Sequence, residues 1–435
     1  MRIRKEYHLL AVLVIVAAAV RLVVAPYSSG SDIPQFEGFA NTFLRHGACF
    51  YLYASGAQYR LEGWPYNWPY PYGPVWIYVL AALKPLVKAE VKAFYVGSHY
   101  YVYVPVEWVC AVKSVLILGD LLLGLLIYYI VKARKGWKAA AVASAIYLFS
   151  PVSIYESAIY GMFDQVVALF LTASLYFFLT EKGKASGFLS AISVLTKQVA
   201  APAVIPELIN SLRGRKMIHF MLGFASAVLL VYFPIALMCP ASLWNALTAF
   251  WATAKPSYTY PIPYSFNGVS ALATYLHEIT REDFTYLLQY WFVPYISLQV
   301  WIIFRLLKGW DPVKAMYASY AAFLATYWRV NYQYFVTLTA LAVVALYLSR
   351  SLTLKEEVLI IYSSIIIPAI WVFIYPIAWW FHVHIQHPNT FVVSLMESIT
   401  LHVFEPRFYV AYSLTLTTFL YMSVIVLLLT RKCLK

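Results

Sequence analysis

The fold class is decided by the stretch HLLAVLVIVAAAVRLVVAPYSSGSDI at residues 8–33. Its apolar run from Leu9 to Val24 fits a first transmembrane helix, which needs about 20 residues to cross a bilayer. The run is followed closely by Asp32, which the sequence therefore predicts at the membrane surface. Because no small-residue cleavage site follows cleanly, we expect a retained helix and not a signal peptide.

The composition indicates the same class along the whole chain. Of 435 residues, 62% are hydrophobic and 12% are charged, and the mean hydropathy is +0.70. Soluble domains contain about 25% charged residues, so the chain is predicted to be an all-α polytopic membrane protein. The net charge of +13 does not indicate nucleic-acid binding, because the basic residues separate apolar runs and form no single patch.

The apolar runs predict about twelve transmembrane helices. They lie near residues 8–26, 107–131, 139–156, 164–180, 185–197, 199–210, 217–238, 285–307, 313–329, 332–349, 357–379 and 408–430. The pair at 185–210 is too short for two ordinary spans, and Pro202 and Pro206 favour two half-length helices or one broken helix. With both termini cytoplasmic, the cytoplasmic loops contain most of the 32 basic residues, as the positive-inside rule requires.

Long outer segments are expected at 27–106, 239–284 and 380–407, within a single membrane-embedded domain of residues 1–435. In the first, residues 75–88 are expected to form an amphipathic or re-entrant helix, because a full span there would move Lys132 to Lys138 outside. The four cysteines show no metal or redox spacing. A bridge between Cys49 and Cys239 is open, but four unpaired thiols are expected.

Three acidic side chains are candidates for chemistry on the outer side. Asp32 is the first, with the alternative that it caps the segment that starts at Ile33. Glu156 and Asp164 lie in the short connection Tyr155–Gln165, on the same side of the membrane as Asp32. Ionisable groups at such a boundary face water or a partner, although a polar turn with Asp164 as a helix cap explains them equally well.

Two basic residues are candidates for binding phosphate. Lys197, in Leu195-Thr-Lys-Gln198, lies between the two half-length helices, where free backbone N–H groups are also available. The alternative is that Lys197 extends to the membrane surface. Arg329 falls at an outer helix boundary, where the positive-inside rule disfavours it. It could also be the counter-ion of Glu156 or Asp164.

His382, His384 and His387, with His402 further on, have a spacing that metal ligands also show. No acidic residue accompanies them before Glu397. We therefore expect an interfacial loop with polar histidines, and metal binding stays open as an alternative.

Together these motifs resemble those of the GT-C superfamily of glycosyltransferases, which use polyprenyl-phosphate sugars. Asp32 looks like the acid of the superfamily's first outer loop, and Tyr70-Pro-Tyr-Gly-Pro-Val-Trp resembles its Tyr-Pro-Pro-Leu element. The stretch 150–165 resembles the Asn-Pro…Glu-Ser…Trp-Gly-Gln-Phe-Asp pattern of mannosyl- and glucosyltransferase-like members, and 187–198 is similar to the segment that follows. Tyr264-Ser-Phe-Asn-Gly resembles a later outer loop. Asn331-Tyr-Gln-Tyr resembles a His-Glu-x-Tyr element but lacks its His and Glu.

The resemblance implies a GT-C-like helical bundle that transfers mannose or glucose, with inversion, from a dolichyl- or polyprenyl-phosphate sugar to an acceptor on the outer face. Asp32 would be the general base. The implied substrate-binding residues are Glu156, Asp164, Gln165, Lys197, Gln198, Arg329 and Tyr332. The implied partners are the lipid-linked donor, a lipid-linked or glycan acceptor and membrane lipid. No cofactor is expected, and a divalent metal stays open.

Two readings from other classes compete with the enzyme. A lipid-linked sugar transporter or flippase would share the broken helix and the charges within the membrane, but the sequence shows no internal repeat. The missing His and Glu near Asn331 keep a non-catalytic membrane subunit open as well.

Overall fold

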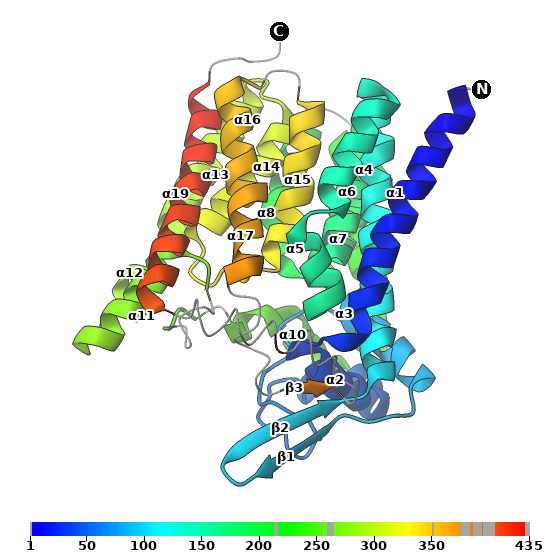
Figure 1. The fold of residues 1–435 in the computed structure, drawn as a ribbon, viewed down its shortest axis with the longest axis vertical. Coiled ribbons are helices and arrows are strands. Elements are labelled where there is room, and N and C mark those ends of the chain that lie inside the picture. Colours follow the sequence, from blue (N-terminus) through cyan, green and yellow to red (C-terminus); the bar gives the residue numbers. More distant parts are fainter. Residues whose placement is uncertain are drawn as a thin grey trace.

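The computed structural model describes residues 2–212, 216–253, 255–258, 265–349, 352–374, 383–385, 394 and 405–430. Its long helices stand side by side in one bundle, and α1 begins at the same end of the bundle at which α19 finishes (Figure 1). We call this the terminal end. The helices of the bundle are α1 (Arg2–Val24), α4 (Val106–Leu148), α6 (Asp164–Leu179), α7 (Gly183–Thr196), α8 (Ala201–Ser211), α9 (Lys216–Met238), α13 (Phe292–Leu307), α14 (Pro312–Thr326), α15 (Tyr334–Leu348), α16 (Leu354–Ile361), α17 (Ile367–Ile374) and α19 (Pro406–Leu429).

The predicted all-α polytopic membrane fold is confirmed. Among the described residues, five helices are long and apolar enough to cross a membrane: Lys5–Tyr27, Val106–Leu148, Lys216–Met238, Tyr286–Leu307 and Pro406–Leu429. Shorter apolar helices lie at Pro74–Leu86, Asp164–Leu179 and Tyr334–Leu348. The number of twelve spans and the single-domain organisation stay predictions.

Helix α4 contains a reversal that the sequence predicts as two separate helices. Gly136, with φ of 78°, interrupts the helical backbone. The Ser144 hydroxyl then donates to the Gly124 carbonyl at 2.8 Å, across a separation of 20 residues. Since 20 residues of straight helix would extend about 30 Å, the two halves must run antiparallel. Glycine suits this position because a residue with a Cβ rarely adopts a positive φ.

The predicted pair of half-length helices is confirmed as α7 and α8, but the break is not at the prolines. Lys197 itself leaves the helix with an extended backbone, at φ −156° and ψ 123°. Pro202 lies in the first turn of α8 and Pro206 inside it. Proline is tolerated in a first turn because its missing N–H would have no partner there. The break therefore presents Lys197 at the end of α7.

The opposite end of the bundle, which we call the loop end, is covered by the first long loop and by α10 (Pro240–Thr248) (Figure 1). This loop contains α2 (Asp32–His46), α3 (Pro74–Leu83) and the antiparallel strands β1 (Lys92–Val96) and β2 (His99–Val104). A third strand, β3 (Val383–Ile385), pairs in parallel with β2. No strand is predicted here from the sequence, although aromatic residues and valines on both sides of Gly97-Ser98 are typical of a hairpin.

The expectation of four unpaired cysteines is wrong. Cys49 and Cys239 form a disulfide, and their Cα atoms lie 5.3 Å apart. Cys239 directly follows α9 at the loop end, where α10 packs against the segment Gly47–Leu52 that contains Cys49. The bond ties the first long loop to the bundle. Cys110 is a free thiol, and Cys433 lies outside the described residues.

Candidate functional site

Asp32 is positioned by the connection between α4 and α6. It is the first residue of α2, and the preceding Ser31 makes no side-chain cap. The Tyr160 hydroxyl donates to Asp32 Oδ2 at 2.5 Å. Asp32 is therefore hydrogen-bonded to a residue that is distant in sequence, Tyr160. A role as a helix cap alone does not account for this bond.

A backbone contact between the two segments places this pair. The Gly30 N–H donates to the Tyr160 carbonyl at 2.7 Å. A Cβ at Gly30 would lie 2.5 Å from the Tyr160 ring, so only glycine allows this approach. Burial raises the pKa of the Asp32 carboxyl above its ordinary value. The Tyr160 hydrogen bond and the charges of Lys197 and Arg329 oppose that rise.

Lys197 is nearly fully buried and has three kinds of contact. Its ammonium group lies 2.6 Å from Asp164 Oδ2 and donates to Gln333 Oε1 at 2.8 Å. Three aromatic rings surround it, with centroids between 4.8 and 5.6 Å from the nitrogen: those of Tyr72, Phe163 and Tyr334. These cation–π contacts favour a charged ammonium group away from bulk water.

The first long loop contributes Tyr72 through a very close approach to the end of α7. A Cβ at Gly73 would lie 2.0 Å from the Leu195 carbonyl oxygen, so a larger residue would separate the two segments. The Tyr70 hydroxyl donates to the Gly73 carbonyl at 3.1 Å and closes the turn between them. The segment Tyr70–Gly73 of the predicted motif therefore packs beside the side chain of Lys197.

Around this ion pair lie polar groups with no protein partner among the described residues. Glu156 and Gln165 are fully buried, and neither carboxylate oxygen of Glu156 nor either amide atom of Gln165 has a hydrogen bond. Asp164 Oδ1 and Gln198 Oε1 also lack one. Buried polar groups are normally satisfied, because an unmade hydrogen bond costs about 1–3 kcal/mol. Such a cluster is suited to binding a polar ligand.

The remaining predicted residues lie on the segment between α14 and α15. Arg329 is half-buried, and its positive charge opposes the rise in the pKa of Asp32 that burial causes. The Tyr332 ring packs against Tyr160 at 5.0 Å between centroids and against Trp371 at 4.8 Å. The structure thus brings Asp32, Asp164 and Lys197 together with Arg329 and Tyr332 at their border.

Sequence reasoning missed Tyr160 and Gln333 as site residues. Both occur in motifs that the sequence analysis quotes, Tyr155–Gln165 and Asn331-Tyr-Gln-Tyr. Of the histidines considered as metal ligands, His382, His387 and His402 lie outside the described residues, and His384 falls in β3. Among the described residues, no group of three or more His, Cys, Asp or Glu side chains could hold a metal ion.

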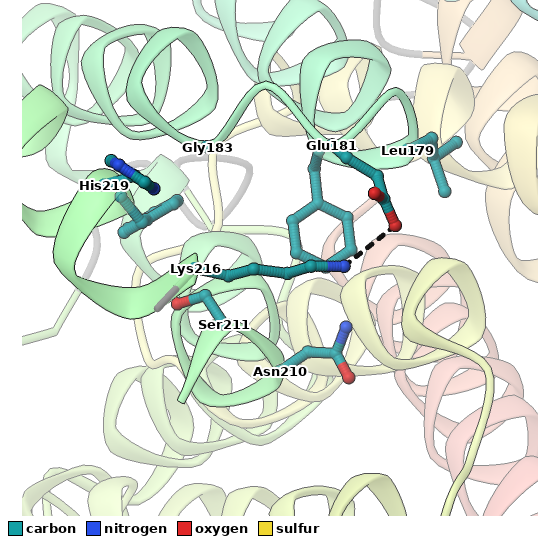
Figure 2. A pocket seen from close by; sticks show the side chains of 9 residues that line it. Leu179, Glu181, Gly183, Asn210, Ser211, Lys216 and His219 are labelled. Atoms are coloured by element: carbon teal, nitrogen blue, oxygen red, sulfur yellow. Dashed lines mark hydrogen bonds and ion pairs between the residues drawn. The ribbon is translucent and has the colours of Figure 1, made fainter. Parts of the chain in front are cut away.

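A separate pocket lies at the terminal end, where α6 and α8 finish and α7 and α9 begin. Figure 2 shows Asn210, Ser211 and His219 along it, with an ion pair of 2.8 Å between Lys216 and Glu181. The hydrogen bond from Lys216 lowers the pKa of Glu181. None of the predicted site residues lines this pocket.

The fold and the charged cluster define an integral membrane protein with a buried polar site toward the loop end of its helical bundle. The chain belongs to glycosyltransferase family 87, whose model matches residues 70–328. The predicted resemblance to membrane glycosyltransferases is therefore confirmed. The matched range contains Glu156, Asp164 and Lys197, while Asp32 and Arg329 lie outside it.

Solved structures with a similar chain path include ArnT from Cupriavidus metallidurans bound to undecaprenyl phosphate, at 14% identity, with 96% of this chain and 76% of that chain covered and a TM-score of 0.48. The apo state of the same protein gives 14% identity, 98% and 77% coverage and a TM-score of 0.49. The apo oligosaccharyltransferase from Archaeoglobus fulgidus gives 13%, 94% and 56% coverage and 0.44. A search of the curated proteins finds no match.

Proposed function

We propose that the protein transfers mannose or glucose from a dolichyl- or polyprenyl-phosphate sugar to an acceptor hydroxyl at the outer membrane face, with inversion at the anomeric carbon. The observation that carries this proposal is the juxtaposition of Asp32 with the buried Lys197–Asp164 pair. Tyr160, which donates to Asp32, packs against Tyr332, and the next residue, Gln333, accepts from Lys197. A base and a phosphate-binding cation are the two groups that this transfer needs. Family membership supports the reaction class.

In the proposed reaction Asp32 is the general base. The carboxylate oxygen that does not bind Tyr160 accepts the proton of the acceptor hydroxyl, and the hydroxyl oxygen forms a bond to the anomeric carbon. On the opposite face the bond from that carbon to the phosphate oxygen breaks, and the lipid phosphate leaves with the electron pair. A phosphate leaving group needs no strong general acid, so one carboxylate suffices.

Lys197 and Arg329 are proposed to stabilise the leaving phosphate. Two of the three ammonium protons of Lys197 are directed to Asp164 and Gln333, which leaves the third for a phosphate oxygen. A cation in a water-poor site stabilises developing negative charge strongly, because little reorganisation is needed during the reaction.

The unpartnered atoms of Glu156, Gln165 and Gln198 are proposed to bind sugar hydroxyls. Carboxylates accept and amides both accept and donate hydrogen bonds, which matches the two roles of a hydroxyl group. Asp164 would bind the sugar through Oδ1 while its other oxygen holds Lys197. Tyr332 would border this pocket.

The outer location of the site is supported by two observations. The loops expected to be cytoplasmic are rich in Lys and Arg, and the disulfide Cys49–Cys239 lies at the opposite, loop end. Disulfides persist mainly in oxidising compartments, so the loop end would face away from the cytoplasm.

The test is transfer of radiolabelled hexose by purified protein in lipid, from dolichyl-phosphate mannose and dolichyl-phosphate glucose to a native lipid extract. We expect Asp32→Asn to lower the rate by about 10²–10⁴-fold, as loss of a general base does. The control is Asp283→Asn, an exposed acid whose partners Tyr258 and Thr285 lie outside the site. The anomeric configuration of the product tests inversion.

Substantial transfer by Asp32→Asn would remove Asp32 as the base. If folded wild-type protein makes no product from either donor, the transporter or the non-catalytic subunit replaces the enzyme.

A further inference from the structure

We propose that Lys113 is a positioning residue that fixes Asp32 and Tyr160 in one geometry. Lys113 lies on α4 and is fully buried. Its ammonium group donates to the Ser28 and Ala25 carbonyls at 2.6 and 2.9 Å, on the segment that leads to Asp32. It also donates to the carbonyls of Ala158 and Ile159 at 2.7 and 2.8 Å, directly before Tyr160. The proposal rests on the proposed role of Asp32 as the base.

The bonding of Lys113 differs from that of the other lysines that are buried among the described residues. Lys84, Lys197 and Lys314 each pair with a carboxylate. Lys113 is bonded to four carbonyl oxygens and the Ser28 hydroxyl, and no carboxylate is among these partners. An ammonium group has only three protons, so these five acceptors share them. Backbone carbonyls from two separate segments therefore converge on one cation.

A buried charge of this kind is poorly explained by stability alone. Burying an ion costs free energy, and an apolar side chain of similar size is often as stable in its place. Carbonyl dipoles compensate the ammonium group only while both segments remain together. The ammonium group thus acts as a distance constraint between the chain before Asp32 and the chain before Tyr160.

The constraint extends directly to the proposed reacting carboxylate. Between the ammonium group and Asp32 there are two further bonds across the same pair of segments: Gly30 N–H to the Tyr160 carbonyl at 2.7 Å and Tyr160 hydroxyl to Asp32 at 2.5 Å. Without Lys113, the backbone at Ala25 and Ser28, before Asp32, can move away from the backbone at Ala158 and Ile159, before Tyr160. An error of about 1 Å in the position of a reacting group can lower a rate 10²-fold.

The experiment compares Lys113→Met, which keeps length without charge or donor, with Lys113→Gln, which keeps a donor. The matched control is Lys314→Met, which removes an equally buried lysine that pairs with Glu356, on helices α14 and α16 that carry none of the proposed site residues. For Lys113→Met we expect kcat per folded molecule to fall about 10–100-fold, with KM for the lipid-linked donor changed less than about twofold. Lys113→Gln should recover part of kcat, and Lys314→Met should change neither constant per folded molecule.

A second measurement needs no activity. Hydrogen exchange followed by mass spectrometry reports on two peptides, 25–32 and 155–162. The first contains the Gly30 N–H, and the second contains the Tyr160 carbonyl that accepts its hydrogen bond. We expect Lys113→Met to speed exchange in both peptides, and Lys314→Met in neither. Unchanged exchange, or an unchanged kcat in active protein, would overturn the proposal. If wild-type protein is inactive but Lys113→Met speeds exchange in both peptides, the positioning contact stands and the proposed function fails.

Discussion

Two buried ion pairs of this molecule, Arg21–Asp120 and Lys197–Asp164, differ in how completely the polar atoms around them are hydrogen-bonded. Arg21 on α1 and Asp120 on α4 form an ion pair of 2.6 Å, with both side chains fully buried. Asp120 also accepts from the Tyr147 hydroxyl at 2.5 Å and from Ser153 and Ser157. Arg21 uses its remaining donors on the carbonyls of Ala17 and Leu148 and on the same serines. Every polar atom of this pair has a partner.

The Lys197–Asp164 pair has the same separation of 2.6 Å but lies among unsatisfied atoms. Asp164 Oδ1 and the polar atoms of Glu156 and Gln165 have no partner among the described residues. A buried polar network that is fully satisfied rigidifies a fold, whereas a partly satisfied one is costly. The two pairs are alike in charge and burial and differ in whether the polar atoms around them have hydrogen-bond partners. We call the Arg21–Asp120 pair saturated and the Lys197–Asp164 pair, beside which the proposed substrate site lies, unsaturated.

The largest expected effect is on the saturated pair. Asp120→Ala leaves Arg21 buried without its counter-ion, and we expect a loss of about 3–5 kcal/mol of folding free energy. Thermal or denaturant unfolding in detergent measures it. Asp120→Asn, which keeps the size of the side chain, should lose less. An Asp120→Ala protein as stable as wild type would show that saturation does not mark a structural pair.

The next effect concerns activity at the unsaturated pair. Lys197→Gln keeps an N–H donor for Asp164 but removes the charge, so we expect the transfer rate to fall about 10²–10³-fold. The stability loss should be smaller than that of Asp120→Ala. Rates from saturating donor, normalised to folded protein, provide the measurement. Retained activity would remove Lys197 from the phosphate site.

Glu156→Gln is expected to affect stability in the opposite direction from Asp120→Ala. It replaces a buried carboxylate that has no hydrogen-bond partner among the described residues by a neutral amide of the same shape, so the unfolding temperature should stay equal or rise. If Glu156 accepts a sugar hydroxyl, KM for the donor should rise about tenfold, as loss of a hydrogen bond to a charged group predicts. A protein that is destabilised with unchanged KM would assign Glu156 a structural role.

The smallest effect is a shift in pH dependence. Burial raises the pKa of Asp32, and the groups that face it are Tyr160, Lys197, Asp164 and Arg329. A base works only when deprotonated, so kcat/KM should fall as pH drops through this raised pKa and be constant above it. Tyr160→Phe removes a hydrogen bond that lowers the pKa, so the acid limb should move to higher pH. A shift to lower pH would contradict the assignment of Asp32.

Much of the helical framework could be predicted because apolar runs of fixed length identify membrane helices. Lys197 could be found because a lysine at a break between apolar helices is unusual. The pairing of Arg21 with Asp120 could not, since the residues are 99 positions apart and only the packing of α1 against α4 brings them together. The same holds for Lys113, because four of its five partners are backbone carbonyls, which no side-chain pattern reveals.

The disulfide between Cys49 and Cys239 has a consequence for biogenesis. Its cysteines are separated by 190 residues, so the ribosome must synthesise all of α9 before the bond can form. If the loop end is translocated as proposed, the disulfide can fix the first long loop to the bundle only after the chain has been inserted as far as Cys239. In a truncated product that ends before Cys239, the first long loop would lack this disulfide and would be more accessible to proteases on that side of the membrane.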